Sequence, residues 1–136
     1  MHMLKVLSFL ITLSVSVNIS AEEYIPKSGD TDLGNALIQL NKKINKKTGR
    51  FSYKLASIFQ VPEASVTVLF THYEFTPADV LMTLSIADSS GEPVNNVAKT
   101  YFDNKKNGWE YTLYQMKVVK GTAVYQQIKT DAEAEY

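Results

Sequence analysis

The residue types that most often carry catalysis are scarce in this chain. It has no Cys and two His, and of these only His72 lies beyond the first 21 residues. Nucleophilic or acid–base catalysis would need partners beside that His, and zinc would need several further ligands. Glu74 and Asp79 are nearby acids, but neither is four residues from His72. We therefore interpret His72 as a partly exposed surface residue and predict no catalytic or metal-binding residue.

Two short acidic segments, 30–32 and 88–92, contain oxygen ligands of the kind that calcium accepts. Neither matches the twelve-residue EF-hand loop with its terminal Glu. Asp32 is more simply the N-cap of a helix, and residues 88–92 are more simply a turn between helices. Glycine-rich phosphate and dinucleotide motifs do not occur, so no cofactor is expected. An enzyme would need a concave site with perturbed carboxylates, such as Glu63, Glu74 or Asp79, and we do not expect one.

Basic residues gather in one stretch of the sequence. Four of them are four residues apart, and on a continuous helix they would form one ridge flanked by the other two. The six residues are Lys42, Lys43, Lys46, Lys47, Arg50 and Lys54. This ridge is either a solvated helix face or a surface for an anionic partner, such as an acidic protein or a phospholipid headgroup.

Aromatic residues form a second cluster between positions 101 and 114. We expect Tyr101, Phe102 and Trp109 to be buried, because Val97 and Ala98 share their helix face. Two further tyrosines are better surface candidates, and two neighbouring lysines would complete a mixed aromatic and basic binding patch. The predicted patch residues are Lys105, Lys106, Tyr111 and Tyr114.

Helical periodicity dominates the rest of the chain. Leu33, Leu37, Leu40 and Ile44 form one apolar face, and a second series from Phe51 indicates another helix after a break near Gly49. Pro62, Pro77 and Pro93 are typical of first helical positions. Further helices are expected over 109–116 and 123–128. The valine-rich segments 66–68 and 117–119 leave a strand as the alternative there.

The helix starts are marked most clearly at Thr76, whose hydroxyl is expected to cap a helix by accepting from the Asp79 amide. Gly91 should end that helix. Asn107 and Gly108 allow a sharp turn before Trp109, which would bring its indole against Val97, Tyr101 and the 81–84 face. We therefore predict an all-α protein, a compact orthogonal bundle of five to seven short helices.

The first 21 residues resemble a secretory signal peptide. Lys5 precedes an apolar run of 6–17, and Ala21 is followed at once by two acids. A buried helix or a retained anchor is the alternative. The predicted organisation is therefore a signal peptide (1–21), a flexible leader (22–32), a helical domain (33–130) and an acidic tail (131–136).

Residues 76–109 carry a sequence pattern that resembles a known group. Thr76-Pro77-Ala78-Asp79 begins it, Pro93-Val94 continues it, and Tyr101, Asn104-Lys105 and Gly108-Trp109 complete it. The pattern resembles a family of small exported helical proteins of bacteria, over roughly residues 50–128. The resemblance implies the fold and export, and it implies no reaction. The residues after Trp109 depart from the family pattern, which leaves any shared surface there open.

These observations limit the function classes that the sequence supports. Lysine and arginine together number 14, as do aspartate and glutamate, so the chain lacks the basic excess typical of nucleic-acid-binding proteins. The sequence predicts a non-enzymatic, periplasmic or secreted helical module that binds another macromolecule. The alternative is an envelope-associated protein that contacts anionic lipid through the lysine-rich helix. After cleavage no membrane span would remain.

Overall fold

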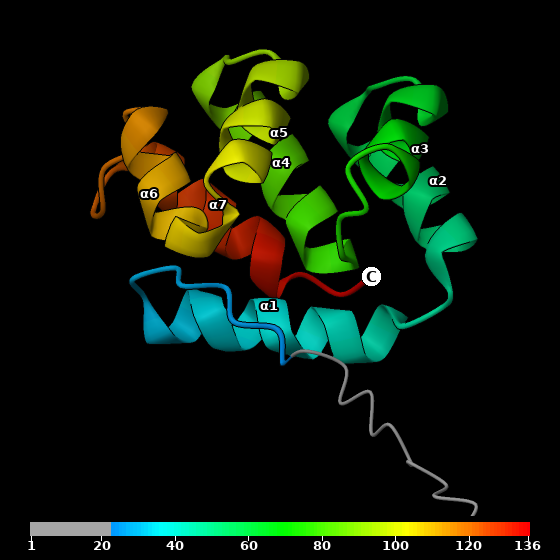
Figure 1. Ribbon diagram of the computed structural model, residues 1–136, viewed down its shortest axis with the longest axis horizontal. Helices are drawn as coiled ribbons and strands as arrows, with labels where there is room; N and C mark the ends of the chain where they lie inside the picture. Colours follow the sequence, from blue (N-terminus) through cyan, green and yellow to red (C-terminus); the bar gives the residue numbers. More distant parts are fainter. Residues whose placement is uncertain (1–22) are drawn as a thin grey trace, which may run out of the picture.

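The computed structural model describes residues 23–136, and the chain folds there into helices joined by short turns (Figure 1). The predicted signal peptide lies outside the described residues. In chain order the helices are α1 (Thr31–Ile44), α2 (Thr48–Phe59), α3 (Glu63–Thr71), α4 (Pro77–Ser90), α5 (Val94–Asp103), the short 3-10 helix η1 (Lys105–Asn107), α6 (Gly108–Gln115) and α7 (Ala123–Glu133). No strand occurs in residues 23–136, so the all-α prediction is confirmed and segments 66–68 and 117–119 form none.

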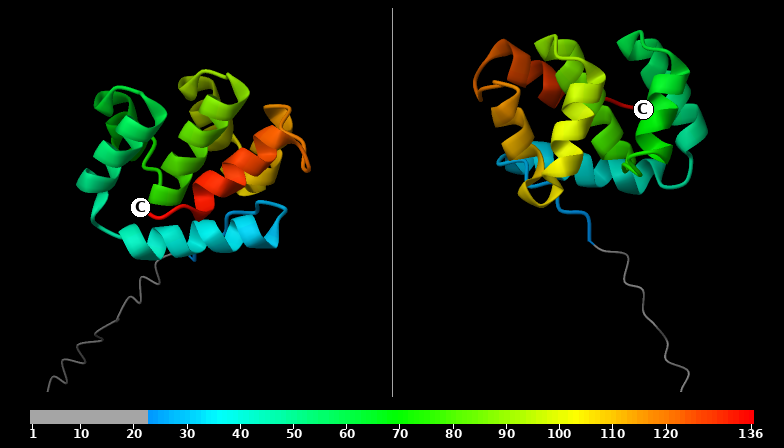
Figure 2. Two further views of the ribbon diagram at one scale, coloured as in Figure 1. Left: turned by 180° about the vertical axis from the view of Figure 1, so that it is seen from behind. Right: turned by 45° about the horizontal axis from the view of Figure 1, so that its top comes forward.

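Helix α4 is the centre of the bundle. Every residue from Ala78 to Ala87 is buried, as expected for a helix that is apolar around most of its circumference. It packs against α7, α1, α2 and α5. Figure 1 shows α1 running along one edge of the molecule, with the other helices standing over it, and Figure 2 shows the same arrangement from behind.

The N-terminus of α4 forms as its sequence predicts. The Thr76 hydroxyl accepts from the Asp79 amide at 3.3 Å, and Gly91 ends the helix with a positive φ of 78°. A second acceptor comes from α1, because Asn41 Oδ1 accepts from the Ala78 amide at 2.7 Å. Two of the helix's free N–H groups are thereby satisfied, one locally and one by another helix.

Several predicted helix boundaries are corrected. The break between α1 and α2 lies at residues 45–47, before Gly49. The residue with a positive φ in this break is Asn45, at 46°. The N-cap of α1 is Asp30, whose carboxylate accepts from the amides of Asp32 and Leu33, so Asp32 belongs to the first turn. Pro62 and Pro93 are N-caps and precede the first helical residue.

The predicted flexible leader is also corrected. Residues 23–30 lie on the bundle, because the carbonyls of Pro26 and Lys27 accept from the amides of Trp109 and Glu110 at 3.0 and 2.9 Å. Pro26 and Ser28 are buried. Thr31 and Asp32 already belong to α1, and at the other end α7 extends to Glu133, so half of the predicted acidic tail is helical. None of the helices within residues 23–136 is long and apolar enough to cross a bilayer.

Candidate anion-binding groove

A groove lies where the end of α1, the start of α2 and the residues after α7 meet. Its volume is about 320 Å3. Four basic side chains line it together with three apolar or aromatic ones: Lys43, Lys47, Arg50, Lys54, Ile44, Phe51 and Tyr136. The basic residues come from α1, from the turn and from α2, so the groove depends on how the two helices join.

The break between α1 and α2 selects which cations share the groove. After Ile44 the chain turns, with the Lys47 amide donating to the Ile44 carbonyl at 2.8 Å, and α2 then leaves in a new direction. The predicted ridge required one continuous helix, so its four-residue spacing does not hold across the break. Lys43 and Lys47 join Arg50 and Lys54 in the groove, whereas Lys42 lines a different hollow beside Tyr24 and Asn41. Lys46 is exposed on the turn.

The floor of the groove is apolar and partly aromatic. Ile44 and Phe51 are buried, and the ring of Tyr136 meets the ring of Phe51 edge-on with 5.6 Å between centroids. Such a floor under charged side chains favours a ligand that has both apolar and anionic groups, because each finds a matching surface.

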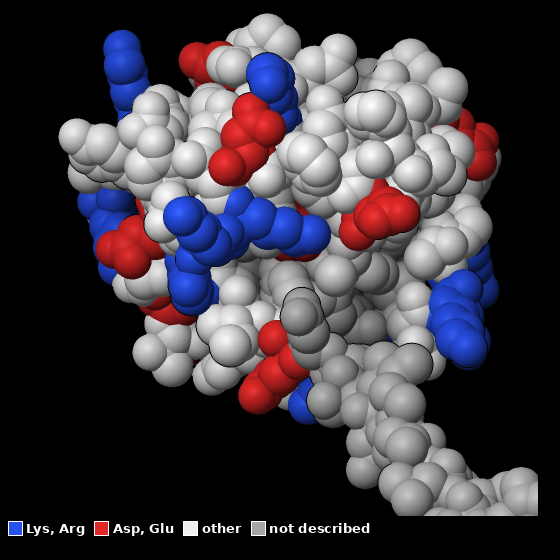
Figure 3. Space-filling model, viewed as in Figure 1, with Lys and Arg blue, Asp and Glu red and all other residues white. Residues whose placement is uncertain are grey.

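Little negative charge within residues 23–136 neutralises these cations. Lys43 Nζ pairs with Glu135 Oε2 at 2.8 Å, with the Lys43 side chain about half exposed and the Glu135 side chain almost fully exposed. Lys47, Arg50 and Lys54 form no ion pair with any described residue. Figure 3 shows basic side chains at the edge of this face beside the junction of α1 and α2, and a second group over η1 and α6.

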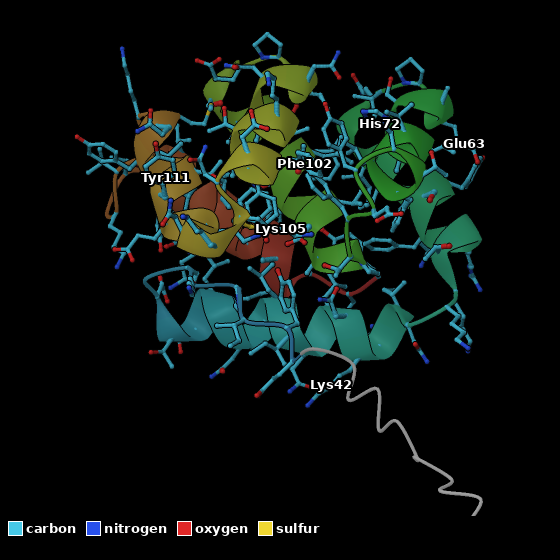
Figure 4. All side chains as sticks on the ribbon, in the orientation of Figure 1. Lys42, Glu63, His72, Phe102, Lys105 and Tyr111 are labelled. Atoms are coloured by element: carbon cyan, nitrogen blue, oxygen red, sulfur yellow. The ribbon has the colours of Figure 1, made fainter. Side chains whose placement is uncertain are left out.

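The second predicted patch is not assembled as one surface. Lys105 Nζ lies over the ring of Phe75, 5.9 Å from its centroid, and the Lys106 carbonyl accepts from Lys27 Nζ at 2.6 Å. Tyr114 is exposed and lines a separate shallow hollow with Lys117 and Val118. Tyr111 is half-buried on α6, and Figure 4 shows it well apart from Lys105.

Burial of the aromatic cluster follows the prediction in two of three positions. Trp109 and Tyr101 are buried and stacked, with 3.7 Å between ring centroids and an interplanar angle of 5°. Phe102 is 49% exposed, which corrects its expected burial, because it is one residue beyond the inward face that Val97, Ala98 and Tyr101 define. Its ring meets the ring of Tyr73 in a T-shaped arrangement, with 5.5 Å between centroids.

The structure gives the Asp79 carboxylate a larger role than the sequence predicted. Asp79 is fully buried, and its Oδ1 accepts from Trp109 Nε1 at 2.9 Å and from the Tyr24 hydroxyl at 2.7 Å. Its Oδ2 has no hydrogen-bond partner among the described residues. Burial raises the pKa of the Asp79 carboxyl, and the hydrogen bonds from Tyr24 and Trp109 oppose that rise only in part.

The Asp79 cluster links three parts of the chain that are distant in sequence, and of its members Tyr24 lines the hollow beside Asn41 and Lys42. Asp79 lies 30 residues from Trp109 and 55 from Tyr24, so no local spacing in the sequence reveals the cluster. The sequence offered only one hint of this cluster, an acid in the first turn of a helix in a chain that has a single Trp. We assign Asp79 a structural role.

The other polar residues singled out by the sequence have structural positions too. His72 is exposed at the C-cap of α3, and Glu63 begins the same helix at its opposite end (Figure 4). Asp30 caps α1, accepts from the Tyr125 hydroxyl and pairs with Lys129 at 3.2 Å. Among residues 23–136, no three His, Asp or Glu side chains are grouped closely enough to hold a metal ion.

Comparisons with protein families, with curated proteins and with solved structures return no match to this chain. The resemblance over residues 50–128 therefore stays a prediction, and the groove is interpreted from its own geometry.

Proposed function

We propose that this protein is a non-enzymatic binding module whose groove between α1 and α2 takes an acidic segment of another macromolecule. The observation that supports the proposal most strongly is the convergence of Lys43, Lys47, Arg50 and Lys54 over an apolar floor. Three of these four cations have no anionic partner among the described residues, so they are available to one.

The shape of the groove favours an extended peptide segment over a flat surface. Its cations stand around a concave apolar floor formed by Ile44 and Phe51, on which the ring of Tyr136 packs, so a ligand must enter the groove to reach both the cations and the floor. Electrostatic attraction between exposed charges extends about 8 Å at physiological salt, which is enough to guide such a segment and too short to retain it without contact. Charge therefore sets the association rate and the choice of partner, and the apolar floor adds affinity.

The test uses a labelled peptide of sequence Ala-Glu-Ala-Glu-Tyr-Glu-Ala-Glu and fluorescence anisotropy. We expect saturable, salt-sensitive binding. The double variant Lys47→Glu/Lys54→Glu should weaken it at least fivefold, because exposed ion pairs are each worth roughly 0.2–1 kcal/mol and reversal adds repulsion. The double variant Lys42→Glu/Lys46→Glu makes the same charge change outside the groove and should alter affinity less than twofold. Equal losses in the two double variants would refute the groove.

Contact with anionic lipid is a second candidate, and one observation favours it. On α2, Tyr53 is 67% and Ile58 54% exposed. Arg50 precedes Tyr53 by three residues and Lys54 precedes Ile58 by four, so each apolar side chain has a basic neighbour one turn away. Basic residues beside exposed apolar ones are typical of surfaces that bind anionic membranes. Pelleting with phosphatidylglycerol vesicles should then depend on both Tyr53 and Ile58. Equal pelleting with neutral vesicles would refute this second candidate.

We also propose that the protein works outside the cytoplasm, in the periplasm or as a secreted protein. The proposal is supported by the signal-peptide pattern of residues 1–21. Intact-mass measurement of protein recovered from its cells should show a chain that begins at Glu22. A chain that keeps its first 21 residues would contradict cleavage.

A further inference from the structure

The residues that follow α7 lie against the groove. Figures 1 and 2 show this segment running from α7 toward the corner between α1 and α2. Glu135 pairs with Lys43, and the Tyr136 ring packs edge-on against Phe51. The Tyr136 hydroxyl donates to the carbonyl of Asp131 at 2.6 Å, which holds the tyrosine near the end of its own helix. An acid and an aromatic residue of the chain itself are thus bound where the proposed ligand would bind.

This segment also divides two hollows. One is the groove itself, and the other, of about 250 Å3, lies between α1 and the end of α7. Ala36, Leu40, Ala132 and Glu135 are among the residues that line the second hollow, and Lys43 lines both. The Lys43–Glu135 pair is therefore the boundary between them. If residues 134–136 moved away, the two hollows would join along α1.

We propose that residues 134–136 are an intramolecular competitor for the groove, and that the ligand is a peptide segment with the same pairing of an acid and an aromatic residue. This inference rests on the proposed function and adds the ligand class and the means of regulation. The segment neutralises only Lys43, whereas a ligand with further acids would also reach Lys47, Arg50 and Lys54. Such a ligand has an electrostatic advantage over the segment that it displaces.

The contacts that hold the segment are weak enough to be exchanged. Glu135 is 94% exposed, and an ion pair at that exposure is screened by solvent and salt. A tethered competitor nevertheless acts at an effective concentration in the millimolar range. For a segment whose own intrinsic dissociation constant is about 0.1 mM, such a competitor lowers the apparent affinity of a free peptide about tenfold, whatever the intrinsic affinity of that peptide.

The experiment compares peptide affinity in the intact chain and in the double variant Glu135→Gln/Tyr136→Ala, with the labelled octapeptide described above. The double variant should bind about tenfold more tightly. Glu133→Gln is the matched control, because it removes one exposed acid near the groove and leaves the segment's contacts in place. It should change affinity less than twofold, which separates competition from a general change in charge. Circular dichroism verifies that each variant keeps its helices.

The outcomes distinguish this inference from the proposed function. If the double variant and the intact chain bind alike, while Lys47→Glu/Lys54→Glu weakens binding, the groove stands and the competition is refuted. If Glu133→Gln tightens binding as much as the double variant, net charge explains the effect and the competition is again refuted. If no form of the protein binds the octapeptide, the ligand class and the proposed function both fail.

Discussion

Asp79 shows how one residue can serve both local and long-range structure. Its amide completes the Thr76 cap, and its carboxylate receives hydrogen bonds from Trp109 and Tyr24. Removing a partner of a buried carboxylate costs more than the hydrogen bond itself, because the remaining group stays desolvated. The single Trp, the N-terminal segment and the central helix therefore depend on one side chain.

Asp79→Asn should change how stability depends on pH. Burial raises the pKa of the folded-state carboxyl above its ordinary 3.8, so the folded protein binds this proton more tightly than the unfolded chain. The free energy of unfolding of the parent protein then loses up to about 1.4 kcal/mol per pH unit as pH rises from about 4 toward the raised pKa. Asparagine cannot ionise. Urea titrations at several pH values should therefore show that the free energy of unfolding of Asp79→Asn rises relative to that of the parent protein as pH rises.

The groups that face Asp79 do not confuse this measurement. Burial also raises the pKa values of Tyr24 and Tyr101, so both keep their protons between pH 4 and 8.

Asp30→Asn is a control of opposite sign. Burial favours a higher pKa for Asp30, but hydrogen bonds from Tyr125 and Leu33 and the charge of Lys129 outweigh it and lower the pKa to about 2. The Asp30 carboxylate contributes its full stabilisation above pH 3.8 and loses it as pH falls toward 2. Between pH 2 and 4, the free energy of unfolding of Asp30→Asn should therefore fall relative to that of the parent protein as pH rises. Parallel curves for Asp79→Asn and the parent would contradict the expectation.

At the residue scale, the sequence predicts burial better than it predicts partners. The apolar spacing around Val97 is enough to place Tyr101 and Trp109 inside, and their stacking follows from that burial. The hydrogen bond to Asp79 spans 30 residues and has no periodicity to reveal it. The predicted burial of Phe102 is wrong for a geometric reason, because its neighbour Tyr101 already points to the buried face of α5.

At the scale of elements, the helices are predictable and the joint between α1 and α2 is not. The spacing of Leu37, Leu40 and Ile44 predicts α1, and Thr76 with Pro77 predicts where α4 begins. Gly49 misleads because glycine marks many helix ends, whereas here Asn45 takes the positive φ. That difference of a few residues decides which cations share the groove, so the basic residues were predictable from sequence and their grouping was not.

The start of α4 offers a prediction about two separate caps. Thr76→Ala removes the acceptor for the Asp79 amide, and Asn41→Ala removes the acceptor for the Ala78 amide. Each should lower the free energy of unfolding by about 1 kcal/mol, since N-cap losses are typically of that size. Chemical denaturation gives both values. Thr67→Ala on exposed α3 is a matched control for the loss of a threonine and should cost much less. A Thr76→Ala variant as stable as the parent would show that the cap contributes nothing.

At the scale of the whole molecule, the N-terminal segment acts as a strap across the bundle. Residues 23–30 connect α4 through Tyr24 and α6 through the carbonyls of Pro26 and Lys27. Their polarity and their Pro and Gly residues suggest a mobile leader, yet their backbone groups complete the hydrogen bonds at the start of α6. The sequence misses this because the contacts join residues 55 to 83 positions apart.

Gly108 is where that strap meets α6, and Gly108→Ala tests it. Gly108 has φ 71° and ψ −167°, a conformation that is essentially restricted to glycine. A Cβ there would lie 2.3 Å from the Lys27 Cβ and 2.8 Å from the Pro26 carbonyl oxygen.

Gly91→Ala is the matched control, because its φ of 78° is similarly left-handed and an added Cβ meets no atom within 4 Å. We expect Gly91→Ala to cost about 1 kcal/mol from backbone strain alone. Gly108→Ala should cost roughly 1–3 kcal/mol more, since its ψ of −167° adds backbone strain that the ψ of 3° at Gly91 does not, and since the strap must also shift. Hydrogen exchange should then quicken at the amides of Trp109 and Glu110, which the strap protects, while the amides inside α4 keep their order of protection. Equal losses of stability in the two variants, with unchanged exchange at Trp109, would mean that the strap does not stabilise the bundle.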